Sequence, residues 1–191
     1  PVIFGEPASW LALLIEALRL TAENRHTEAR NLREMAFEQA PTTGGSMEEN
    51  AFEWIADADS RLGPVLEAIV NGRYYWIPFN RISKIALDEP SDLRDVVWMP
   101  AHFTMASGGE VVALIPTRYP ASESSDDGRI RLARKTEWTE PSEGTYHGLG
   151  QRMLATNSGE YPLMDVRSIR LEGSPEESAD EGSPEAGGAA S

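Results

Sequence analysis

Cysteine is absent from this chain of 191 residues. Its absence excludes disulfide bridges, thiolate metal sites and thiol nucleophiles. Histidine is scarce: only His26, His102 and His147 occur, and none has a second histidine at the spacing that zinc sites use. Long apolar runs are also missing, since the longest, Trp10 to Ile15, is far shorter than a membrane span. We therefore expect neither a zinc site nor a membrane-spanning segment.

Positive charge is in short supply as well. The chain has 17 Lys and Arg against 31 Asp and Glu, which gives a net charge of −14 at pH 7. Five of these acids lie in the last nineteen residues, so the remainder of the chain keeps a net charge of −9. Such a chain is repelled by nucleic acid and by an anionic membrane surface. We expect neither as a partner, and a basic protein partner fits better.

The first part of the chain, residues 1–45, has the pattern of a helical hairpin. Trp10, Leu14 and Leu18 recur at every fourth position, which is the spacing of one apolar helix face. A second helix is predicted from Thr27 to Ala40, where the following proline stops it. We therefore predict two packed helices before the chain changes character.

The hairpin resembles a tetratricopeptide (TPR) repeat. That repeat has Trp and Leu three residues apart, then an Ala, then a Pro after its second helix, and Trp10, Leu13, Ala29 and Pro41 follow this order. Arg33 stands where the repeat has an aromatic residue, so an ordinary helical hairpin remains the alternative. One repeat cannot bury its own apolar face, and we expect further helices before the first residue.

Residues 46–172 change to the pattern of β-strands. Short apolar segments alternate with turn residues, and we predict six to eight antiparallel strands that close into a small barrel. Residues 173–191 contain no bulky apolar side chain, so we predict a disordered acidic tail. The predicted fold class is α+β: a TPR-like helical hairpin, an antiparallel β-barrel-like domain and the tail.

The clearest hairpin of this part turns at Asn71-Gly72. This dipeptide accepts positive φ at both central positions of a two-residue turn. Such a turn sets Glu67 opposite Trp76. The register of the two strands around it is therefore predicted residue by residue.

Two further hairpins and one more strand are predicted, but the sequence constrains their register less than that of the Asn71-Gly72 hairpin. A turn at Gly108-Gly109 would place Phe103 and Leu114 on the same face of the sheet. Another turn is expected at residues 157–159, and a strand is expected over residues 129–138. These segments complete the expected antiparallel domain.

The stretch DADSRLGP, residues 57–64, is the most suggestive motif for chemistry. It places Asp57 and Asp59 two positions apart. As a calcium loop beginning at Asp57 it fails, because Leu62 stands at the sixth position and Ala68 at the twelfth, where Gly and Glu are needed. We therefore expect no metal and no cofactor.

Two interpretations of the acid pair remain. In the first, the Asp side chains accept backbone N–H groups at a turn, and one of them binds Arg61 through a bidentate pair. In the second, Asp57 and Asp59 act with His102 in a hydrolase, which requires the three side chains to converge in one cleft. We favour the structural interpretation and do not expect an enzyme.

Arginine and aromatic residues are the remaining candidates for ion pairs and for contacts with a partner. Only two of the 17 bases are lysines, and arginine is the better partner for buried or interfacial carboxylates. Arg94-Asp95 repeats the pairing of the acid motif, and Arg152 could face Asp165. Aromatic residues in strands usually pack in the core, but an exposed one beside arginine is typical of a protein-binding hot spot. The candidate partner-binding residues are Trp54, Tyr75, Trp76, Trp98, Arg118 and Tyr119.

Several long motifs in this order resemble one protein family. They read FEWIADADSRLGPVLEAIVNGRYYWIPF, DLRDVVWMPA and ALIPTRY, followed by KTEW, GLGQRML and GEYPLMDVRSI. These motifs are similar to those of the ImpE family, also called TagJ. GEPASWLALLIEAL, near the start, resembles the end of the helical portion of that family. The resemblance covers roughly residues 3–171, and the family has further TPR-like helices before this point.

The resemblance implies a cytoplasmic accessory protein of the bacterial type VI secretion system. Family members are not known as enzymes, and they bind a helix near the N-terminus of the small subunit of the contractile sheath. Through the sheath they are linked indirectly to the AAA+ unfoldase that recycles it. A module with no partner of its own remains an alternative, which a surface without a sizeable apolar patch would favour.

Overall fold

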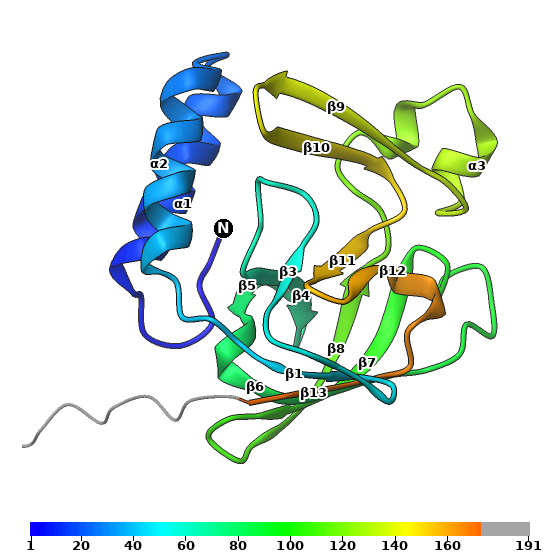
Figure 1. Ribbon diagram of the computed structural model, residues 1–191. Coiled ribbons are helices and arrows are strands. Elements are labelled where there is room, and N and C mark those ends of the chain that lie inside the picture. Colours follow the sequence, from blue (N-terminus) through cyan, green and yellow to red (C-terminus); the bar gives the residue numbers. More distant parts are fainter. Residues whose placement is uncertain (173–191) are drawn as a thin grey trace, which may run out of the picture.

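The computed structural model describes residues 1–172, so the predicted disordered tail, residues 173–191, lies outside the described residues. Two helices at the start, α1 (Ser9–Ala22) and α2 (His26–Gln39), lie side by side (Figure 1). Both predicted helices are confirmed. No helix among the described residues is long and apolar enough to span a membrane.

The two helices pack closely against each other through a buried, largely apolar face that contains small residues. Trp10 and Leu14 of the predicted stripe are buried, while Leu18 is only half-buried. On α2 the buried residues are Ala29, Arg33 and Ala36. The arginine at the position where a TPR repeat has an aromatic residue is therefore part of the buried face.

The strands follow in three antiparallel sheets (Figure 1). The eight-stranded sheet has the order β2-β1-β13-β6-β7-β8-β4-β5, the three-stranded sheet the order β12-β11-β3, and β9 pairs with β10 alone. A short helix, α3 (Gly128–Arg131), precedes β9. The strands are β1 (Gly45–Met47), β2 (Asn50–Phe52), β3 (Ile55–Asp57), β4 (Val65–Val70), β5 (Arg73–Pro78), β6 (Ile82–Leu87), β7 (Trp98–Met105), β8 (Glu110–Pro116), β9 (Thr136–Ser142), β10 (Thr145–Gly150), β11 (Met153–Thr156), β12 (Gly159–Pro162) and β13 (Ser168–Leu171).

The eight-stranded sheet is open, so the predicted barrel is wrong. Its end strands, β5 and β2, do not pair with each other. The outer edge of β5 is already occupied by residues 2–4, which two backbone hydrogen bonds of 2.8 and 3.0 Å join to Trp76. At the other end, side chains of residues 157–158 bond to the backbone of residues 51 and 53. Edges that are covered in this way are not available to close a barrel.

The hairpin at Asn71-Gly72 is confirmed with its register. Both turn residues have positive φ, and Glu67 lies opposite Trp76. The turn at residues 157–159 is also confirmed, since it joins β11 to β12. The expected strand over residues 129–138 is wrong in its first half, where α3 forms, and β9 begins only at Thr136.

The predicted face assignment of the β7–β8 hairpin is wrong. Phe103 pairs with Val111, whereas a two-residue turn at Gly108-Gly109 would have paired it with Leu114. The loop is longer than predicted, and the register moves by three residues. Because the shift is odd, every side chain of β8 changes face relative to the prediction. Leu114 and Val112 consequently share a face with His102.

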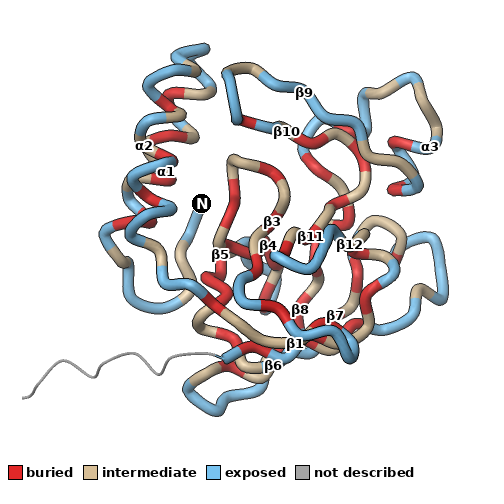
Figure 2. The backbone as a smooth tube through the Cα atoms, viewed as in Figure 1, coloured by how far each residue is buried: buried red, intermediate tan, exposed pale blue. Residues whose placement is uncertain are grey.

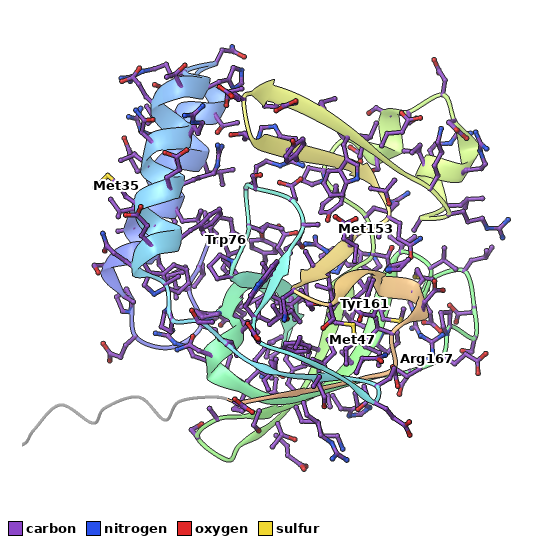
Figure 3. All side chains as sticks on the ribbon, in the orientation of Figure 1. Met35, Met47, Trp76, Met153, Tyr161 and Arg167 are labelled. Atoms are coloured by element: carbon purple, nitrogen blue, oxygen red, sulfur yellow. The ribbon has the colours of Figure 1, made fainter. Side chains whose placement is uncertain are left out.

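Two apolar cores hold the described residues together. The larger lies on the inner face of the eight-stranded sheet and includes Phe103 and Ile115. The smaller joins the helices to β4 and β5 through Leu14, Val65 and Trp76. Figure 3 shows Trp76 between the helical hairpin and the strands, and in Figure 2 buried segments gather where these parts face one another. The hairpin is therefore packed on the strands and shares a core with them.

Candidate functional site

The DADSRLGP motif forms a tight loop between β3 and β4. Asp57 Oδ1 accepts a hydrogen bond from the Asp59 N–H at 2.9 Å, and Asp59 Oδ1 accepts one from the Arg61 N–H at 2.8 Å. The Asp57 N–H donates to the Gly63 carbonyl at 2.7 Å, which closes the loop. Gly63 has φ of +56°, a conformation that favours glycine. Each aspartate thus stabilises the turn that follows it.

Asp59 also holds Arg61 and β10. Its carboxylate is fully buried and accepts from Nε and Nη2 of Arg61, with the Nε contact at 2.8 Å. Asp59 Oδ2 accepts in addition from the Gly148 N–H at 2.7 Å. The bidentate pair expected for this motif is therefore made by Asp59.

Asp57 belongs to a second buried charge cluster. Arg152 is completely buried and donates to Asp57 through Nη1, to Glu67 through Nη2, and to the Pro116 carbonyl through Nε at 2.9 Å. The suggested pairing of Arg152 with Asp165 is wrong. The guanidinium points inward, where two buried carboxylates of β3 and β4 need a counter-ion.

Two tyrosines complete this cluster. The Tyr119 hydroxyl donates to Asp57 Oδ1 at 2.9 Å and accepts from the Met153 N–H at 3.0 Å. The guanidinium carbon of Arg152 lies 5.2 Å from the centre of the Tyr119 ring, which is a cation–π distance. The Tyr74 hydroxyl donates to Glu67 and accepts from the indole N–H of Trp76 at 2.7 Å. The cluster therefore joins strands of two sheets.

The protonation of these groups follows from their burial. Burial raises the pKa of Asp57 to about 6, although the Arg152 cation acts in the opposite direction. Burial, followed by the Asp57 charge, raises the pKa of Tyr119, and burial with the Glu67 charge raises that of Tyr74. Both tyrosines thus remain neutral hydrogen-bond donors at pH 7. Every carboxylate oxygen of Asp57 and Asp59 accepts a hydrogen bond from a group of the same chain.

His102 does not approach the acid pair. It lies on β7 between Ala86 and Val112, with its side chain exposed and 3.7 Å from Asp88. The hydrolase hypothesis required His102 to share a cleft with Asp57 and Asp59, and the structure does not bring them together. Among residues 1–172, no group of three or more His, Asp and Glu side chains is arranged to hold a metal ion.

His147 of β10 and Arg33 of α2 are two polar groups that the sequence did not mark as a pair, and the Arg33 charge acts on His147. Burial lowers the pKa of His147 to about 4, and the Arg61 cation acts in the same direction. Burial also lowers the pKa of Arg33, which donates to the Thr21 hydroxyl. His147 Nε2 and Arg33 Nε are buried without a hydrogen-bond partner among the described residues. Arg33 lies between Ala29 and Ala36 on the buried helix face, and that spacing was the available signal.

The Arg94-Asp95 pair is looser than the other acid–arginine contacts. Arg94 is largely exposed, with Nη2 3.6 Å from Asp95 Oδ1. The second oxygen of Asp95 accepts from the backbone N–H and the hydroxyl of Ser91 at 2.9 and 3.0 Å. These backbone and hydroxyl contacts lower the pKa of Asp95, so this aspartate serves chiefly as a turn cap.

The candidate partner-binding residues fall into two groups. Trp54 and Trp98 are exposed, by 40% and 37% respectively, and Arg118 is half-buried. Tyr75 is half-buried and packs edge-to-face on Phe4. Trp76 and Tyr119 lie in the interior, at 2% and 1% exposure. Their side chains are occupied by the helix–strand core and the charge cluster, so a partner on the surface would not contact them directly.

Trp54 borders a groove between the end of α2 and β3. The groove has a volume of about 410 Å³. Phe37, Ala40 and Pro41 form the wall on the helix side, and Ala155 of β11 also lines it. The other wall is formed by residues 54–58 and by Ser60, Gly63 and Pro64 of the DADSRLGP loop. Phe37 was not predicted; an aromatic residue near the end of a helix, four residues before Pro41, was the available signal.

The described structure is thus of the mixed class: a helical hairpin packed on antiparallel sheets, with a charge cluster whose groups bind one another and a groove lined mainly by apolar residues. The ImpE protein family model matches residues 49–170, and the chain belongs to this family. This confirms the family predicted from the sequence motifs.

The chain is similar in sequence to the Type VI secretion system accessory component TagJ of Pseudomonas aeruginosa, which is 48% identical over 172 residues. The match covers 90% of this chain and 60% of TagJ, so the chain spans about three-fifths of that curated relative. The crystal structure of protein VPA1032 from Vibrio parahaemolyticus superimposes with a TM-score of 0.81 at 21% identity, over 90% of this chain and 64% of that one. The second likeness concerns the fold alone.

Proposed function

We propose that the chain acts as a non-enzymatic accessory protein of a type VI secretion system and works by binding another protein. Family membership and the 48% identical relative, which is an accessory component of such a system, support this role. The family resemblance further suggests the partner, a helix near the N-terminus of the small sheath subunit. The same resemblance suggests a cytoplasmic location and an indirect link to the AAA+ unfoldase that recycles the sheath.

The observation that carries the proposal is that the two aspartates of the acid motif are engaged in hydrogen bonds within the chain. Asp57 and Asp59 accept hydrogen bonds from backbone, arginine and tyrosine groups of their own chain. A general base needs a free oxygen within reach of the proton that it removes. Trp54 and the groove beside it are, by contrast, accessible. The accessible groove favours a binding role over both the hydrolase and a module without a partner.

A peptide titration tests the proposed function. A labelled peptide of the N-terminal helix of the small sheath subunit is titrated with this chain, and the anisotropy of the label is recorded. We expect saturable binding with a dissociation constant in the micromolar range, which is common for a single helix in a groove. A peptide with the same composition in scrambled order is the control. Silence of the native peptide at several hundred micromolar would count against the proposal.

A further inference from the structure

We infer that the partner helix docks in the groove between the end of α2 and β3, and that it carries bulky apolar side chains flanked by Lys or Arg. The inference rests on the proposed function and adds the site and the chemistry of the partner. The groove is defined here by its lining residues: Phe37, Ala40 and Pro41, residues 54–58, Ser60, Gly63, Pro64 and Ala155.

Two aromatic side chains give the groove its apolar character. Trp54 is 40% exposed and Phe37 is 39% exposed, on opposite walls. A Cβ atom placed on Gly63 would lie only 2.4 Å from Cε1 of Phe37, so the ring rests against the glycine backbone. Large rigid aromatic residues are enriched among the residues that dominate binding energy. The groove thus presents two such residues within one short stretch of surface.

The shape favours insertion of side chains over addition of a strand. β3 is the end strand of its sheet but is only three residues long. The Asp57 N–H already donates to the Gly63 carbonyl. Strand addition depends on a run of free backbone groups, whereas an amphipathic helix needs a groove for apolar side chains one turn apart. A helix is therefore the better occupant.

Two exposed acids that neighbour the groove aromatics in sequence, without lining the groove, indicate the charge of the flanking residues on that helix. Glu38 and Glu53 follow and precede the two aromatic residues in sequence, and both are exposed. Neither is within ion-pair distance of a base among residues 1–172. The chain as a whole has a net charge of −14. Complementary Lys or Arg on the partner would speed the encounter and fix its orientation.

The buried acid motif connects to this site by holding one wall in place. Five residues of the loop line that wall, and the bonds of Asp57 and Asp59 fix the backbone that carries them: Asp57, Ala58, Ser60, Gly63 and Pro64. A surface that is fixed before binding loses less conformational entropy when the partner arrives. Asp57 and Asp59 are therefore positioning residues for the groove, and they need not contact the partner.

The test compares two exposed tryptophans in the peptide titration. Trp54→Ala and Phe37→Ala are expected to weaken peptide binding at least tenfold. Trp138→Ala is the matched control, because Trp138 is also 37% exposed and does not line the groove. It should change the affinity less than twofold. Circular dichroism and the melting temperature of each variant establish that it is folded.

A pair of charge reversals tests the chemistry of the flanks. The double variant Glu38→Lys/Glu53→Lys should bind the peptide at least threefold more weakly at 50 mM salt, and less so at 500 mM, because salt screens exposed charges. Glu89→Lys/Glu110→Lys makes the same change in net charge at exposed residues elsewhere. It should leave most of the affinity unchanged. Equal losses in both double variants would overturn the charge part of the inference.

The outcomes separate the site from the function. Loss of binding in the Trp54 and Phe37 variants alone supports the groove. Equal binding by all variants, or loss only in the Trp138 variant, overturns the groove but leaves the proposed function standing. Absence of binding by the unmodified chain overturns the proposed function and the inference together.

Discussion

At the scale of single residues, Arg152 is the cation on which the buried charge cluster depends. It is fully buried and is the shared counter-ion of Asp57 and Glu67. Removing one member of a buried ionic group leaves the others unpaired, which costs far more than the intact group contributes. The consequence is asymmetric: the cluster adds little net stability, but it is sensitive to substitution.

We expect Arg152→Met to lower the free energy of unfolding by about 3–5 kcal/mol at pH 7, because two buried carboxylates would lose their cation. Urea unfolding followed by circular dichroism measures this change. Arg94→Met is the control, since Arg94 is largely exposed, and its effect should stay within about 0.5 kcal/mol. Similar losses in both variants would show that burial of the charge is not the cause.

His147 gives the chain a defined response to acid. The pKa of His147 is about 4 in the folded chain, whereas its ordinary value is 6.5. Between pH 4 and 6.5 the unfolded state therefore binds more protons than the folded state. Its contribution to stability is therefore lost as the pH falls from about 6.5 to 4. Asp57 acts in the opposite sense between 3.8 and about 6, because its folded pKa is raised and the folded state takes up the proton.

His147→Gln should remove only the first of these two effects. We expect the variant to gain stability relative to the unmodified chain as the pH falls from 7.5 to 5. The measurement is the difference in urea midpoint between the two proteins at each pH. Parallel pH profiles would show that His147 is not the group responsible.

At the scale of elements, the sequence predicted local features well and long-range ones poorly. The Asn71-Gly72 turn was predicted with its register because a two-residue loop allows one pairing. The β7–β8 register failed because a longer loop allows several. The bond from Asp59 to Arg61 spans two residues and was anticipated, whereas that from Arg152 to Asp57 spans 95 and was not. Glu67 within the apolar segment of β4 was the remaining clue to a buried charge.

The approach of β10 to Tyr119 provides a test at this scale. A Cβ atom on Gly148 would lie 2.3 Å from the Tyr119 ring, whereas one on Gly109 would meet nothing within 4 Å. Gly148→Ala should displace Tyr119 from Asp57 and lower the free energy of unfolding by about 1–3 kcal/mol. Gly109→Ala should change it by less than about 0.5 kcal/mol. Chemical denaturation of the two variants makes the comparison, and equal stability would contradict the packing described here.

At the scale of the whole molecule, residues 2–4 help to explain why the eight-stranded sheet stays open. Residues 2–4 lie along the outer edge of β5 and hydrogen-bond to Trp76, which itself packs between the helices and the strands. The sequence suggested two separate parts, residues 1–45 and 46–172. A shared core and a shared edge instead lead us to expect one cooperative unit.

Leu14→Ala tests that expectation, because Leu14 is fully buried in the core between the helices and β4–β5. The substitution should cost about 2–5 kcal/mol, as for other leucines in closed cores. Circular dichroism at 222 nm reports mainly the helices. Tryptophan fluorescence, recorded in a Trp10→Phe background because Trp10 lies in α1, reports mainly the strands, which hold Trp76, Trp98 and Trp138. If the parts unfold together, both signals move to the same lower urea midpoint. Loss of the helical signal alone would mean that the hairpin unfolds independently, and Leu93→Ala, at an 80% exposed position, should move neither signal.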